Sequence, residues 1–157
     1  EEEQIVNFRI TNIFFAAALF ATAGGPALAA KGLEPSNPQR SYAAGVVTEG
    51  GRIVWLAGMG GTRAPDGSKL EGIAAQTRQA FRNIEAALKQ AGGSLSNVVS
   101  MTVMIRNQED GNEFVKVRGE FFKSRFPASM LITAKDFAVP ELLVEIQSIA
   151  VIGDTLQ

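Results

Sequence analysis

Two segments with helical periodicity alternate with short β-prone runs between residues 41 and 154, and this alternation limits the possible folds most. Apolar residues recur at helical spacing over residues 73–90, and Gly92 follows, which is a common end for a helix. Residues 112–125 repeat the pattern and stop before Pro127, which disfavours helix in the residue ahead of it. The sequence therefore predicts two amphipathic helices that each cover part of a sheet.

Five β-prone runs surround these helices, at residues 42–47, 52–57, 98–105, 129–133 and 142–152. Glycines between the first two runs predict a tight hairpin, because they permit the positive φ that such turns require. The third run is apolar on both alternate faces, which is typical of a central strand. The order ββαβαββ predicts an α/β (α+β) domain over residues 41–154, with a mixed sheet and both helices on one face. In a chain this small, other copies cover the second face most simply, so we expect a homo-oligomer.

The N-terminal part of the chain has a different composition. Residues 10–23 are almost wholly apolar and lead to Ala-Leu-Ala at 27–29, a sequence of the kind that signal peptidases cleave. We therefore predict a signal-peptide-like segment over residues 1–30 and an exported protein, periplasmic or extracellular, with a cytoplasmic protein as the alternative. An apolar core of about 14 residues is shorter than the roughly 20 that a spanning helix needs, so a membrane anchor ranks second.

If residues 1–30 are retained, they could instead join copies into a filament or other higher assembly, as an exchanged helix or an added strand. Residues 31–40 contain two prolines and are predicted to form an extended linker to the domain. A glycine-rich stretch over residues 58–72 is predicted to be a long surface loop.

Composition disfavours several classes of function. The chain has 15 basic and 16 acidic residues with no basic run, so no nucleic-acid partner is expected. Histidine and cysteine are both absent, which removes thiolate nucleophiles, Ser-His-Asp triads and most zinc sites. No glycine motif for nucleotide phosphates occurs. We therefore predict neither a metal nor a cofactor, and any catalysis must use carboxylates, hydroxyls, amines, the single tyrosine or backbone groups.

Three ordered motifs identify a family: VVSMTV at residues 98–103, FFKSRFPA at 121–128 and VEIQSIA at 144–150. Together they resemble the YjgF-type reactive-intermediate deaminase (Rid) family, whose older members carry an endoribonuclease label. The resemblance covers residues 41–154 in one register. It implies a chorismate-mutase-like trimer with a barrel of sheets inside, helices outside and clefts between subunits. It also implies that members with deaminase activity hydrolyse 2-imino acids without a metal or cofactor.

The resemblance also shows where this sequence departs from the deaminase members. Ser129 stands where their arginine binds the substrate carboxylate, and serine supplies no charge. Val115 stands where they place a cleft asparagine, and Leu131 replaces a cleft cysteine. Met59 follows Gly58 where a glutamine is usual. The sequence therefore predicts a cleft that binds a ligand through altered groups, with Gly58 and Ser129 among its lining residues.

Two candidate catalytic residues remain, Glu145 and Tyr42, which the resemblance implies would position the attacking water. From the residues alone, Glu145 is equally explained as a strand carboxylate at an oligomer cleft, and Tyr42 as a packed aromatic. Arg118 lies one helical turn beyond Val115 and could replace the missing cation, or it could be a solvated surface arginine. Arg63 and Lys69 in the long loop offer the same two interpretations.

The sequence thus leads to a Rid-like trimer that binds a small metabolite between subunits, with weak or no 2-imino acid deaminase activity. The first alternative is a working imine or enamine deaminase, a hydrolase with an altered substrate. The second is a structural assembly protein built through residues 1–30.

Overall fold

The computed structural model describes residues 30–33 and 37–153 of the chain. The signal-like segment at residues 1–29 lies outside the described residues, so its predicted roles stay predictions. Within the described ranges, no helix is both long and apolar enough to cross a membrane.

The described residues form strands and helices in the predicted order. From residue 41 onwards, two strands, a helix, a strand, a helix and two strands follow one another, which confirms the ββαβαββ order. The strands and helices are β1 (Lys31–Leu33), β2 (Gly45–Val47), β3 (Arg52–Trp55), α1 (Gly72–Gln90), β4 (Val98–Ile105), α2 (Gly111–Phe121), β5 (Ala128–Thr133) and β6 (Val144–Ile152). Short 3-10 helices lie at η1 (Pro38–Arg40), η2 (Leu95–Asn97) and η3 (Gln108–Asp110).

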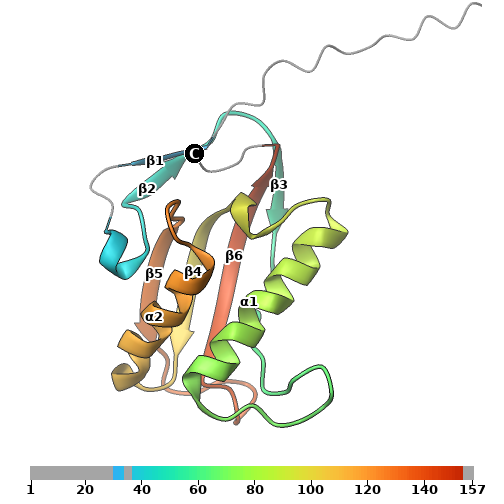
Figure 1. Cartoon of the computed structure of the whole chain (residues 1–157), viewed down its shortest axis with the longest axis vertical. Helices are drawn as coiled ribbons and strands as arrows, with labels where there is room; N and C mark the ends of the chain where they lie inside the picture. Colours follow the sequence, from blue (N-terminus) through green and yellow to red (C-terminus); the bar gives the residue numbers. More distant parts are fainter. Residues whose placement is uncertain (1–29, 34–36, 154–157) are drawn as a thin grey trace, which may run out of the picture.

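The main sheet is mixed and has the strand order β3-β6-β4-β5. Strand β4 runs parallel to β5 and antiparallel to β6, which in turn runs antiparallel to β3. Both α1 and α2 lie on one face of this sheet (Figure 1). The predicted mixed sheet, its central strand at β4 and the placement of both helices on one face are therefore confirmed.

The predicted hairpin at the start of the domain is wrong. Strand β2 pairs with β1 in a separate two-stranded ribbon, whereas β3 pairs with β6 at the edge of the main sheet. Gly50 and Gly51 do adopt positive φ, but their turn carries the chain from the ribbon to the sheet. The predicted linker, residues 31–40, instead holds β1 and η1. Two residues before β2, the Ala43 amide donates a hydrogen bond to the Pro127 carbonyl (3.1 Å), next to the start of β5.

The core lies between the sheet and the two helices. Phe81 of α1 is fully buried, and its ring lies 4.7 Å from that of Phe121 at the end of α2. Helix α2 ends at Phe121, four residues before its predicted end at Arg125. The next residue, Phe122, has an extended backbone and a buried side chain 5.7 Å from the Phe81 ring, so burial of this aromatic accounts for the earlier helix end.

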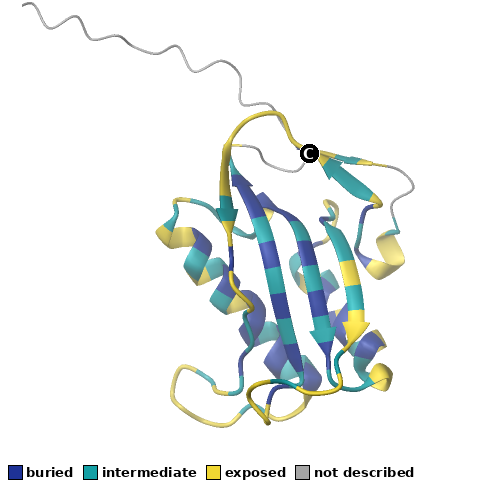
Figure 2. Cartoon of the chain, turned by 180° about the vertical axis from the view of Figure 1, so that it is seen from behind, coloured by how far each residue is buried: buried dark blue, intermediate teal, exposed yellow. Residues whose placement is uncertain are grey.

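The opposite face of the sheet is open over most of its area (Figure 2). The strand register places Ile53, Trp55, Met130 and Ile132 on this face, and between 41% and 72% of each side chain is exposed. They form two pairs, one on each outer strand of the sheet, with β6 and β4 between them. Exposed apolar side chains on an uncovered sheet face are typical of an interaction surface. We call these four residues the open-face patch.

Candidate functional site

Arg118 is the centre of the candidate site, and it is buried rather than solvated. Only 2% of its surface is exposed, so its interpretation as a surface arginine is wrong. Its Nη1 donates a hydrogen bond to Ser129 Oγ at 2.6 Å, and its Nη2 donates to the backbone carbonyl of Arg40. The guanidinium carbon lies 5.3 Å from the centre of the Phe114 ring. Arg118 therefore joins α2, β5 and η1.

Burial of the Arg118 guanidinium disfavours its charged form. It lowers the pKa of Arg118 to about 10, an effect to which the nearby charge of Arg40 adds and which Tyr42 partly opposes. Among the described residues, no carboxylate forms an ion pair with Arg118, and its buried Nε has no hydrogen-bond partner. Arg118 thus stays charged at neutral pH, although buried charges normally have a partner.

Tyr42 belongs to the same neighbourhood. It is half-buried, its backbone carbonyl accepts a hydrogen bond from the Asn37 amide (2.8 Å), and it interacts electrostatically with Arg118. The structure therefore brings together three of the residues predicted from the sequence, Tyr42, Arg118 and Ser129.

The two apolar candidates, Val115 and Leu131, lie on the same side of the sheet as Arg118. Val115 is 8% exposed and belongs to the main core, against which the half-buried Leu131 packs. Met59 bridges Ile146 and also packs against this core. Of these residues, Leu131 is the one that also lines a pocket at the start of α2.

Glu145 lies on the opposite face of the sheet. Its register partner is Met104, whereas Ser129 pairs with Met101, and residues an odd number of positions apart on a strand point to opposite faces. Gly58 lies against Glu145, because a Cβ at position 58 would come within 2.8 Å of the Glu145 carboxyl carbon. Within one chain, the predicted site residues therefore form two groups, one on each face.

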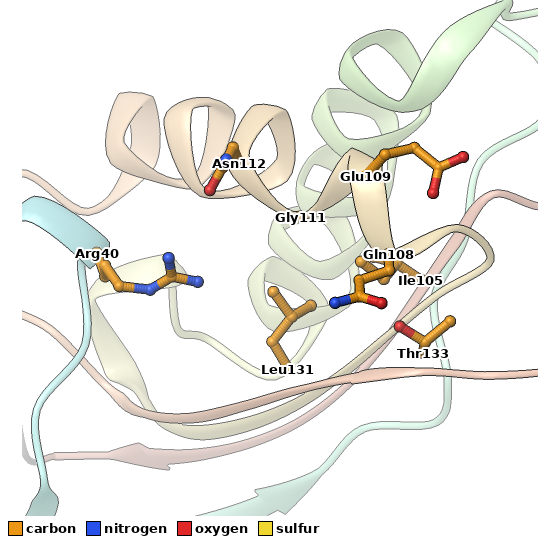
Figure 3. Close-up of a pocket in the computed structure, with 8 residues that line it drawn as sticks. All are labelled: Arg40, Ile105, Gln108, Glu109, Gly111, Asn112, Leu131 and Thr133. Carbon is orange, nitrogen blue, oxygen red and sulfur yellow. The ribbon is translucent and has the colours of Figure 1, made fainter.

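A pocket of about 710 Å³ opens where α2 begins (Figure 3). Its lining residues are Arg40, Ile105, Gln108, Glu109, Gly111, Asn112, Leu131 and Thr133. Figure 3 shows the Arg40 guanidinium and the Gln108 amide pointing toward one another across Leu131, whereas the Glu109 carboxylate points away. Sequence reasoning missed Arg40, which falls in the predicted linker; its place two residues before Tyr42 is the signal that could have found it.

The carboxylates of the described residues are dispersed. No three of them gather into a group that could hold a metal ion.

Comparison with known proteins places these features in a family. The model of the family described as Endoribonuclease L-PSP matches residues 33–152. The chain belongs to this family. The L-PSP family is the Rid family of the motifs above. The match begins at residue 33, so it includes the last residue of β1 and all of η1.

Several named proteins of this family are similar to the chain in sequence or structure. The 2-iminobutanoate/2-iminopropanoate deaminase of Dermatophagoides farinae is 34% identical over 103 residues, which are 65% of this chain and 80% of that protein. The human protein of the same name is 31% identical over 104 residues, which are 65% of this chain and 74% of that protein. A Rid-family protein of unknown function from Yersinia pestis has a solved structure with a TM-score of 0.66 and 26% identity, covering 77% of this chain and 96% of the other.

Proposed function

We propose that the protein is a homotrimeric member of the L-PSP (Rid) family that binds a small metabolite in clefts between subunits. We further propose that it has weak or no activity on 2-imino acids.

The arrangement of Ser129 and Arg118 carries this proposal. The family resemblance implies an arginine at position 129 that would bind a substrate carboxylate. Here a guanidinium does reach this position, but it comes from α2, is 2% exposed and is already bound to Ser129 Oγ and the Arg40 carbonyl. A substrate carboxylate that lacks this charged anchor loses roughly 1.5 to 3 kcal/mol of binding.

The division of the site between two faces supports an oligomer. Glu145 and Ser129 point away from one another within a chain, so both can border one cleft only if they come from different copies. The open-face patch supplies an apolar surface on which copies can associate. Light scattering that gives the mass of one chain at micromolar concentration would contradict the homotrimer.

Turnover of 2-iminopropanoate, generated from 2-aminoacrylate, tests the proposed loss of activity. Water adds to the C=N bond, the C–N bond breaks, and ammonia and a 2-oxo acid leave. We expect the wild-type protein and Glu145→Gln to accelerate this hydrolysis to the same small extent. A fast wild-type reaction that collapses in Glu145→Gln, with unchanged thermal stability, would overturn the proposal.

That outcome would favour the second candidate, a working imine deaminase with an altered substrate. The contact of Glu145 with Gly58 favours it, because the half-exposed carboxylate lies against backbone that carries no side chain. Such a carboxylate could orient a water molecule, with Tyr42 as its partner across the cleft.

We also propose that the protein is exported, from the signal-like composition of residues 1–30. Mass spectrometry of the native chain tests this proposal, and we expect an N-terminus at Ala30. A native chain that keeps residues 1–29 would favour the anchor or the assembly element instead. The same number of chains per particle with and without these residues would then exclude the assembly element.

A further inference from the structure

We infer that Arg40, fixed in place by the buried Arg118, is the residue that binds the anionic group of a small carboxylate in the pocket beside α2. This inference rests on the proposed function, because it names the class of ligand and the anchor in the same cleft.

The backbone of Arg40 is held on both sides. Its amide donates a hydrogen bond to Asn37 Oδ1 at 3.1 Å, and its carbonyl accepts one from Arg118. The next residue, Ser41, is buried in a left-handed conformation with φ of 53°, which turns the chain sharply after Arg40. A fixed backbone reduces the entropy that the side chain loses on binding, so this is a pre-organised position.

The side chain of Arg40 extends into the pocket. Figure 3 shows its guanidinium directed over Leu131 toward Gln108, and it is the one basic side chain among the residues that line this pocket. Among the described residues, no carboxylate forms an ion pair with it. A planar guanidinium in this position offers paired hydrogen bonds to a carboxylate.

The other lining residues limit the rest of the ligand. Leu131 and Ile105 supply an apolar surface, and the Gln108 amide and the Thr133 hydroxyl can hydrogen-bond a polar group. These groups suit a short carboxylic acid with an apolar chain and one further polar atom, such as a 2-oxo acid. The ligand carboxylate then meets Arg40, and Arg118 acts as a positioning residue that does not contact it.

Arg118 explains why the anchor lies on η1. Its guanidinium links Ser129 of β5 to the carbonyl of Arg40, so it ties η1 to the edge of the sheet beside the pocket. A family arginine at position 129 would need the space and the hydrogen bonds that Arg118 uses. The change to serine and the placement of Arg40 are therefore parts of one arrangement.

Equilibrium binding of 2-oxobutanoate and of its uncharged amide, measured by NMR titration, tests the inference. In Arg40→Gln we expect at least a tenfold loss of affinity for 2-oxobutanoate and no change for the amide. Arg82→Gln is the matched control, because Arg82 is exposed on α1 and lines a different groove, and we expect it to bind both probes as the wild type does. We expect Arg118→Met to weaken 2-oxobutanoate binding less than Arg40→Gln and to leave amide binding unchanged.

The outcomes separate this inference from the proposed function. Wild-type affinity for 2-oxobutanoate in Arg40→Gln overturns the inference alone, and a larger loss in Arg118→Met would make Arg118 the anchor. If the wild type binds neither probe, the proposed ligand-binding function fails and the inference fails with it. Equal losses for acid and amide in Arg40→Gln would show a damaged pocket rather than a lost charge, and would also overturn the inference.

Discussion

Replacement of Arg118 by methionine should cost little stability, even though the residue is 2% exposed and hydrogen-bonded on two sides. Methionine matches the aliphatic stem of arginine, and its flexible side chain can follow the same path toward Phe114, although it ends before the position of the guanidinium. The change removes the buried charge and leaves the apolar packing largely in place.

The magnitude follows from the opposing effects of burial and hydrogen bonding. Burial, together with the nearby charge of Arg40, lowers the pKa of Arg118 to about 10, which corresponds to about 3 kcal/mol of unfavourable energy for its charged form at about 1.4 kcal/mol per pH unit. Loss of the two hydrogen bonds to Ser129 and Arg40 costs about 1.5 kcal/mol each, the lower end of the range for charged hydrogen bonds, because both contacts are part-buried and water can replace the lost donor. We expect the two effects to cancel to within about 1 kcal/mol.

The pH dependence of unfolding tests whether the buried charge of Arg118 destabilises the fold. Because the folded-state pKa is lowered, the cost of the charged form is fully present below pH 10 and fades only as the pH rises above it. The difference in stability between Arg118→Met and the wild type should therefore be constant from pH 5 to pH 8. Urea unfolding at several pH values in this range measures it.

A loss of 3 to 5 kcal/mol in Arg118→Met would refute this reasoning, because removal of one partner of a compensated buried charge has that effect. Arg118→Lys is the matched control. It keeps the charge without the two-sided hydrogen bonds, so we expect it to be less stable than Arg118→Met.

Three other changes test separate parts of the structure. Ser129→Arg alone should destabilise the fold by about 2 to 4 kcal/mol in urea unfolding, because it places a second guanidinium beside Arg118. The double variant Ser129→Arg/Arg118→Tyr should recover this stability, because it removes one of the two charges. Trp55→Lys, on the open face, should lower the particle mass in light scattering and leave the circular dichroism of the chain unchanged; an unchanged mass would remove Trp55 from the interface. Phe81→Ala should cost about 3 to 5 kcal/mol in thermal unfolding, since Phe81 is fully buried, and a loss below 1 kcal/mol would contradict its place in the core.

The parts of the fold that depend on local periodicity were predictable from the sequence. Strand β4 begins and ends at the predicted residues, and α1 begins one residue before its predicted start. Residues of α1 repeat apolar side chains at helical spacing, and β4 is a run of eight mostly β-branched and apolar residues, so each pattern specifies its own structure. The open sheet face was also predictable, because the two helical patterns within residues 41–154 both cover one face of the sheet, and the structure places both α1 and α2 on that face.

The parts that depend on contacts between distant residues were not predictable in this way. Strand β1 has only three residues and pairs with β2 across a proline-containing segment, so nothing in its own composition distinguishes it from a linker. The early end of α2 reflects the packing of Phe122 on Phe81, which periodicity along α2 does not contain.

One part of the candidate site is visible in the sequence, and the other part depends on contacts that form only in the fold. The absence of an arginine at Ser129 is visible in the motif, whereas the burial of Arg118 depends on η1 folding over it. Charged residues on helices are mostly exposed, so composition alone favours the wrong environment for Arg118. Arg40 carries no motif, and its position in the pocket becomes visible only once η1 is placed beside β5.

The central claim is that this Rid-family cleft no longer has its deaminase anchor in the usual position. Measurement of kcat/KM for 2-iminobutanoate, side by side with the human deaminase relative under the same conditions, tests it most directly. The loss of the charged anchor predicts a kcat/KM about tenfold to a hundredfold below that of the human protein. A kcat/KM equal to that of the human protein, and lost in Glu145→Gln, would contradict the claim.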